Sequence, residues 1–257
     1  MFFDSHCHLD RIDLAEFDND FDTLVQRCAD HQVDEMVCIG VNLETLDDMR
    51  AKVAGRPGIY TTVGVHPDYE DARETSVEEL VELAQAPGVV AIGETGLDYY
   101  HTDGPEWQRQ RFRTHIEAAV EANKPLVIHT RLAKQDTLDI LKEQGAEKVG
   151  GVMHCFTEDW DMARQAIDLG FYISISGIVT FNQAANVREM AARIPDDWLL
   201  IETDSPWLAP TPHRGKTNFP GHVRLVAEKL AELRGVDVEH IASVTRDNAH
   251  RLFRLES

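Results

Sequence analysis

The strongest constraint on the fold is an eightfold alternation of short apolar runs with longer amphipathic segments. The apolar runs are nearly continuous, as is typical of parallel strands buried on both faces. They occupy residues 1–5, 33–40, 59–65, 89–93, 126–129, 149–154, 172–176 and 199–203. The segments between them have helical periodicity and cover residues 18–31, 43–54, 76–85, 106–122, 134–144, 159–169, 185–193 and 221–234. A last helix is expected at about residues 238–252.

Eight strand–helix units in 257 residues give about 32 residues a unit, the size of a βαβ repeat. A (β/α)8 barrel normally takes about 250 residues. An open doubly wound sheet would usually have fewer strands, and the first strand here lacks a glycine-rich phosphate turn. No linker, low-complexity tract or internal repeat divides the chain. We therefore predict an α/β fold with a single TIM barrel domain over residues 1–257 and an active site at the C-terminal face of its strands.

The charge balance limits how the chain could bind nucleic acid. It has 25 Lys and Arg against 45 Asp and Glu, a formal net charge of −20. Such a field repels polyanions at long range and argues against binding through a broad basic surface. A local site where bound cations reverse the sign is still compatible with this charge.

The four cysteines and the absence of targeting signals point to a reducing compartment. Cys7, Cys28, Cys38 and Cys155 form no CxxC pair and no dense framework. No apolar run reaches the roughly 18 residues that span a bilayer. The first residues have no basic region followed by a cleavage site. We expect a cytoplasmic protein with no membrane association and no stable protein partner.

Metal-compatible side chains follow five of the eight predicted strands, where the active site of a barrel lies. They are His6 and His8, Glu94, His129, His154, and Asp204. Because strand side chains alternate, His6 and His8 point to the same side. Any one of these residues alone is more often an ordinary satisfied polar group. Together they would be costly to bury at an apolar barrel mouth unless divalent cations offset the charge. Four imidazoles and two carboxylates suit Zn²⁺, Mn²⁺, Fe²⁺ or, least well, Mg²⁺.

The motifs around these residues resemble the TatD family of metal-dependent hydrolases, within the amidohydrolase superfamily. The segments that carry the resemblance are DSHCHLD, GVHPD, IGETGLDYY, PLVIHTR, GVMHCF, SISGIVTF and LLIETDSPWLAP. The resemblance runs from Phe3 to about Phe253, and GIVTF and PHRGK look most like the YcfH-like branch. Many relatives carry an acidic residue directly before the closing proline, as in NEP, whereas this chain has Phe219 there, in Asn218-Phe219-Pro220.

The resemblance implies a two-metal hydrolase, most often a 3′-to-5′ exodeoxyribonuclease acting on single-stranded DNA or a 3′ end. Carried over by motif, His6 and His8 hold the first metal with Asp204, and Glu94 bridges both metals. His129 and His154 complete the ligand set of the second metal. A glutamate stands at the bridge, where many relatives in the superfamily use a carboxylated lysine.

The catalytic residues expected on this basis are Asp204 and Glu94. Two cations about 3.5–4 Å apart can share a water, make it hydroxide at neutral pH and bind the substrate oxygen. Asp204 would sit beside that water and is the expected proton acceptor. No serine or cysteine nucleophile is needed. Cys7 and Cys155, one residue out of phase with the ligands, are expected to point away into packing.

Five further residues are candidates for substrate binding or for orienting the ligands. His66 could touch a phosphate oxygen or a metal-bound water, and Arg131 and Arg214 could contact phosphate. Asp98 could orient a ligand or pair with Arg131, and Glu202 could hydrogen-bond a ligand imidazole.

Three functions stay open at this point. The first is a phosphodiesterase that trims DNA, or RNA, from an end. The second is a hydrolase of an ester or amide bond, such as the ester of aminoacyl-tRNA, because the same hydroxide serves acyl and phosphoryl centres. The third is a non-catalytic metal-binding scaffold, which the complete ligand set makes the least favoured.

Overall fold

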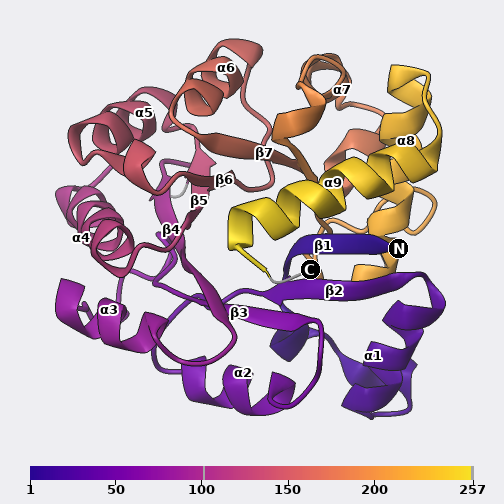
Figure 1. The fold of residues 1–257 in the computed structure, drawn as a ribbon, viewed down its shortest axis with the longest axis horizontal. Helices are drawn as coiled ribbons and strands as arrows, with labels where there is room; N and C mark the ends of the chain where they lie inside the picture. The colour runs from indigo at the N-terminus through magenta and orange to yellow at the C-terminus, as the bar shows by residue number, and fades with distance from the viewer. Residues whose placement is uncertain (101, 256–257) are drawn as a thin grey trace.

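A computed structural model describes residues 1–100 and 102–255 of the chain. Eight parallel strands form one sheet in sequence order, which confirms the predicted barrel (Figure 1). The strands are β1 (Phe2–Cys7), β2 (Val33–Cys38), β3 (Ile59–Val63), β4 (Val89–Asp98), β5 (Leu126–Arg131), β6 (Gly151–Met153), β7 (Phe171–Ile175) and β8 (Leu199–Ile201).

Helices follow the strands and lie around the outside of the barrel, except for the last helix, which crosses one end of it (Figure 1). They are α1 (Phe21–Asp30), α2 (Leu46–Val53), α3 (Val77–Ala84), α4 (Glu106–Ala122), α5 (Lys134–Glu143), α6 (Trp160–Asp168), α7 (Ala185–Ala191), α8 (Val223–Arg234) and α9 (Val238–Phe253). Short 3-10 helices occur at Leu9–Arg11, Leu14–Phe17, Ala146–Lys148, Gly177–Thr180, Asp196–Trp198 and Pro220–His222. None of the helices in the described ranges is long and apolar enough to cross a membrane.

Hydrogen bonds between β1 and the segment around β8 close the barrel. The Ser5 hydroxyl donates to the Ile201 carbonyl at 3.0 Å. The Asp204 amide donates to the His6 carbonyl at 2.9 Å, and the His8 amide donates to the Ser205 carbonyl at 2.8 Å. These bonds bring the first and last strands together, so residues almost 200 positions apart in sequence share one edge of the barrel mouth.

The core has two layers, one outside and one inside the strands. The outer faces of the strands pack against the surrounding helices. Inside, residues such as Phe3, Val37 and Leu200 form a second cluster with Leu252 and Phe253. Leu252 and Phe253 belong to α9. This helix therefore covers the amino end of the barrel, opposite the mouth that carries the site (Figure 1).

The strand boundaries differ from the prediction where polar side chains and turns meet. β4 continues to Asp98, beyond the predicted end at residue 93, because its ladder with β5 persists through the polar GETG segment. β6 and β8 are shorter than predicted. After each of these two, the chain turns through a residue with positive φ, Cys155 at 43° and Asp204 at 55°, which ends the extended conformation.

Candidate metal centre

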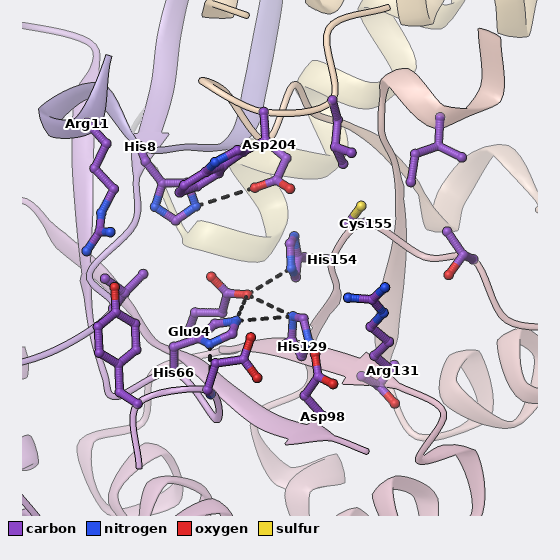
Figure 2. Close-up of a pocket in the computed structure, with 18 residues that line it drawn as sticks. His8, Arg11, His66, Glu94, Asp98, His129, Arg131, His154, Cys155 and Asp204 are labelled. Carbon is purple, nitrogen blue, oxygen red and sulfur yellow. Dashed lines mark hydrogen bonds and ion pairs between the residues drawn. The ribbon is translucent and has the colours of Figure 1, made fainter. Parts of the chain in front are cut away.

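A cavity of about 880 Å³ opens at the mouth of the barrel, at the carboxyl ends of the strands. Its lining includes His8, Glu94, His129, His154 and Asp204. Figure 2 shows imidazoles and carboxylates converging in the middle of this cavity, with arginines on opposite sides. Most of the residues predicted for the site therefore meet in one place.

Alternation along β1 turns His6 and His8 to the same side. Their Nε2 atoms are 3.2 Å apart, and both rings are almost fully buried. Asp4, two residues before His6, fastens this end of β1. Its carboxylate accepts hydrogen bonds from the His6 amide at 3.2 Å, the Thr203 amide at 2.9 Å and the Thr203 hydroxyl at 2.5 Å. Because Thr203 precedes Asp204, Asp4 holds the segments of His6 and Asp204 in register.

Glu94 lies within β4. The sequence had placed it just after the end of that strand. The β4–β5 ladder is irregular between Ile92 and Thr95, and such a bulge re-aims the side chain it contains. Gly93 and Gly96 both have φ of 140°. A Cβ at Gly93 would come 2.5 Å from the Val127 carbonyl oxygen, and one at Gly96 would overlap that of His129. The two glycines let β5 approach closely enough to bring His129 beside Glu94.

The two oxygens of Glu94 face different groups of imidazoles. Oε2 lies 3.4 Å from His6 Nε2. Oε1 lies 2.9 Å from His154 Nε2, 3.2 Å from His129 Nδ1 and 3.2 Å from His66 Nε2. Glu94 thus stands between two clusters of nitrogen donors.

The first cluster has the spacing of a metal-ligand set. His6 Nε2, His8 Nε2 and Asp204 Oδ1 form a triangle with sides of 3.2, 3.4 and 3.6 Å. Ligand atoms about 2.1 Å from a tetrahedral zinc ion are separated by about 3.4 Å. The residues therefore fit a divalent cation at this position.

Two imidazoles predicted to be metal ligands have carboxylates at their outer nitrogens. His129 Nε2 lies 2.9 Å from Asp98 Oδ2, and His154 Nδ1 lies 3.1 Å from Glu202 Oε1. Such contacts place the proton on the outer nitrogen and leave the inner lone pair free for a cation. Of the two partners considered for Asp98, the structure places His129 against it. Glu202 is fully buried and also accepts a hydrogen bond from the Cys155 amide at 2.8 Å.

The electrostatics of the centre are dominated by buried carboxylates. Burial opposes ionisation of Glu94, but the imidazoles of His154, His66 and His6 outweigh it and hold its pKa well below the ordinary value. Burial likewise opposes protonation of His154, but Glu94 and Glu202 raise its pKa well above the ordinary value. The negative potential of Glu94 and Glu202 that raises the pKa of His154 also attracts cations.

The remaining candidates differ in how close they come to the centre. His66 lies against Glu94 and His129. Arg131 lines the cavity, and its guanidinium stacks on Tyr100 with the carbon 3.7 Å from the ring centroid. Arg214 does not line the cavity: it stacks on Phe181 at 3.6 Å and donates to the Ala209 carbonyl at 3.1 Å.

The prediction for Cys155 is wrong, whereas that for Cys7 is confirmed. Cys7 is fully buried, and its thiol donates to the Val37 carbonyl at 3.3 Å. Cys155 instead lines the cavity (Figure 2). The strand alternation used for the prediction does not reach this residue, because β6 ends at Met153 and Cys155 has a φ of 43°.

Sequence reasoning missed four residues that shape the site. Arg11 and Tyr69 line the cavity, and so does Trp207, whose ring lies edge-on to that of His8 with centroids 5.0 Å apart. Asp4 was passed over because it lies inside an apolar strand. The available signals were that Asp4 and Trp207 lie inside the motif segments DSHCHLD and LLIETDSPWLAP, and that Arg11 directly follows the first of them.

A barrel that gathers imidazole and carboxylate donors at its carboxyl-end mouth defines the class of metal-dependent barrel hydrolases. Within this class, the chain belongs to the TatD related DNase family, whose model matches residues 3–254. This confirms the resemblance seen in the motifs.

The relatives agree with both the class and the fold. The chain is 48% identical to the metal-dependent hydrolase YcfH of Escherichia coli, over 99% of this chain and 96% of that protein. It is 32% identical to a protein of Shigella flexneri named 3′-5′ ssDNA/RNA exonuclease TatD, over 93% of this chain and 95% of that one. The crystal structure of the TatD homologue YJJV of Escherichia coli superimposes with a TM-score of 0.89 and 27% identity, covering 99% of this chain and 98% of that one.

Proposed function

We propose that this protein is a phosphodiesterase that uses two divalent cations to remove nucleotides from the 3′ end of single-stranded DNA. One observation carries the proposal: the two carboxylate oxygens of Glu94 face two separate donor groups. A relative that is 32% identical bears the name of a 3′-5′ ssDNA/RNA exonuclease, which favours this substrate over others.

The number of buried carboxylates supports two cations rather than one. Glu94, Asp98, Glu202 and Asp204 surround the centre, and none has more than 15% of its side chain exposed. Uncompensated buried carboxylates are strongly unfavourable. Two divalent cations carry four positive charges, which would balance these four acids.

In the proposed arrangement His6, His8 and Asp204 would hold one cation, His129 and His154 would hold the other, and Glu94 would serve both sites. The bound cations would supply an acidified water and a positive charge for a phosphoryl oxygen. The carboxylate of Asp204 accepts the proton of the attacking water, because it borders the open cavity as well as the donor cluster. Asp98 and Glu202 keep His129 and His154 in orientation.

Substrate contacts are proposed at the cavity walls. Arg131 has its guanidinium held flat on Tyr100, which leaves its N–H edge for a phosphate. Arg11 lies on the other side of the cavity (Figure 2). Trp207, 48% exposed at the rim, offers a face on which a base can stack. Arg214 lies farther out and would contact only a longer strand.

A cytoplasmic location is part of the proposal. Its support is chemical: all four cysteines are free thiols, and three of them are buried. No stable protein partner is proposed.

The experiment is cleavage of a 5′-labelled single-stranded oligonucleotide with Mg²⁺ or Mn²⁺. We expect a ladder of products shortened from the 3′ end, suppressed when the last linkages are phosphorothioates. Aminoacyl-tRNA is assayed in parallel. Release of the amino acid without any DNA ladder would refute the nuclease and favour an ester hydrolase instead.

Replacing Arg131 tests the phosphate contact. Arg131→Gln should raise the KM for the oligonucleotide at least about tenfold, since a charged hydrogen bond contributes roughly 1.5–3 kcal/mol. Arg193→Gln is the matched control, because Arg193 makes the same kind of stack, on Trp160 at 4.7 Å, outside the cavity. Equal KM values for the two variants would remove Arg131 from substrate binding.

A further inference from the structure

His66 differs from the neighbouring imidazoles in whether its protonated ring nitrogen faces the centre or faces away from it. His129 and His154 each present a carboxylate to one nitrogen, Asp98 at 2.9 Å and Glu202 at 3.1 Å. Asp98 and Glu202 accept hydrogen bonds, so the outer nitrogen of each ring carries a proton. The inner nitrogen faces Glu94, and it would offer its lone pair to a cation standing between the ring and Glu94.

His66 is held in the opposite way. The backbone amide of Asp68 donates a hydrogen bond to His66 Nδ1 at 3.1 Å. A backbone amide can only donate, so Nδ1 carries the lone pair and the proton of the neutral ring is on Nε2. Nε2 is the atom that faces the centre, 3.2 Å from Glu94 Oε1 and 3.3 Å from His129 Nδ1.

We propose that His66 is a catalytic hydrogen-bond donor of this site and not a ligand of either cation. Its distances alone would suit a ligand, since Nε2 forms a tight triangle with Glu94 and His129. The Asp68 amide decides against that, because a protonated nitrogen has no lone pair to offer. The Nε2–H group instead donates to the phosphoryl oxygen on which negative charge develops during attack. This role rests on the proposed phosphodiesterase function.

A polar ridge on α4 keeps the His66 segment in place. The ridge consists of Gln108, Arg111 and His115, whose spacing puts them on one face of the helix, and all three are buried. His115 Nε2 accepts from the Val65 amide at 3.0 Å.

The other two ridge residues bind the backbone beyond His66. Arg111 donates to the carbonyls of His66 at 3.4 Å and Tyr69 at 2.8 Å. Gln108 donates to the Pro67 carbonyl at 3.1 Å and accepts from the Asp98 amide at 3.0 Å. The ridge thus ties the His66 turn to the end of β4, where Asp98 orients His129. A donor fixed before the reaction costs no reorganisation in the transition state.

The test compares His66→Ala with His66→Gln, because the glutamine amide can still donate near the position of Nε2. We expect His66→Ala to lower kcat about 100-fold or more, and His66→Gln to recover at least tenfold of that loss. His240→Ala, on the exposed face of α9, is the control for loss of a histidine. Rates are measured on the oligonucleotide and on bis(p-nitrophenyl) phosphate. If the wild type cleaves only the small diester, DNA is not the substrate, and the role of His66 is still tested on the small diester.

Two readouts do not depend on activity. Titration of the apoprotein with Mn²⁺ should give the same number of sites in the wild type and in His66→Ala, with dissociation constants within about threefold. Long-range proton–nitrogen NMR spectra of the ring, assigned by their loss in His66→Gln, should show the proton on Nε2. Loss of one Mn²⁺ site in His66→Ala, a ring protonated on Nδ1, or an unchanged kcat would each overturn the proposal.

Discussion

At the scale of single residues, the chemistry of the site depends on what contacts the far side of each functional group. Asp98 and Glu202 determine which nitrogens of His129 and His154 face inward. The sequence indicated that these acids are near the predicted ligands, since Asp98 shares a motif segment with Glu94 and Glu202 shares one with Asp204. It could not say which ring atom each acid contacts, because that depends on side-chain rotation between different strands.

Asp204 is the residue on which the proposed chemistry depends most. Asp204→Asn should lower kcat by at least about 100-fold, because an amide cannot accept the proton, while the protein still binds at least one divalent cation. Steady-state kinetics and metal analysis of the purified variant check both parts. Asp168→Asn, at an exposed ion pair on α6, serves as the control and should behave as the wild type. Turnover unchanged in Asp204→Asn would exclude Asp204 as the proton acceptor.

At the scale of elements, β4 shows what the pattern of apolar residues can and cannot predict. The apolar run locates the strand, but the run stops at the GETG segment although the strand continues to Asp98. The extension requires backbone contact with β5, and only glycine at positions 93 and 96 allows that contact.

Gly96→Ala should disrupt this contact. Its Cβ would overlap the His129 carbonyl at a φ of 140°, and we expect a loss of about 3 kcal/mol in the free energy of unfolding, together with weaker metal binding. Urea unfolding monitored by circular dichroism measures the first effect. Gly235→Ala is the control, because its φ of 67° is also left-handed but no atom lies within 4 Å of the added Cβ. It should lose only about 1 kcal/mol. Similar losses in the two variants would contradict the steric explanation.

The link between α4 and the loop after β3 should make stability depend on pH through His115. Burial lowers the pKa of His115 to about 4, against an ordinary value of 6.5, although its hydrogen bond to the Arg111 carbonyl acts in the other direction. Between these values the unfolded chain binds a proton that the folded protein does not, so stability falls as the pH falls from about 6.5 toward 4.

This residue should contribute a loss of about 2 kcal/mol between pH 7.5 and pH 5. The measurement is urea unfolding of the wild type and of His115→Gln at both pH values. The glutamine does not titrate, so the variant should lose about 2 kcal/mol less than the wild type over this interval. Parallel losses in the two proteins would show that His115 does not titrate as described.

At the scale of the whole molecule, the barrel and its centre depend on different interactions. The strands are stabilised by an outer core against the helices and an inner core plugged by α9. The centre at the mouth adds buried carboxylates that need cations. Folding and metal binding should therefore be separable.

Removal of metal should abolish hydrolysis without unfolding the protein. After chelation we expect the far-ultraviolet circular dichroism spectrum to persist at 25 °C and Tm to fall by roughly 10 °C, because cations that bind only the folded state stabilise it. Activity should return on addition of Mn²⁺. Loss of the helical signal on chelation would mean that the cations are needed for the fold itself.

The sequence by itself determined the eight strand–helix units, their order and the edge at which the ligands meet. These features follow from periodicity along the chain and from the rule that parallel strands end at one face. Tertiary structure alone decided that Glu94 faces two donor groups, that Cys155 enters the cavity and Arg214 does not, and that His66 presents a proton instead of a lone pair. Each of these depends on contacts between segments that are separate along the chain, and no local pattern contains such contacts.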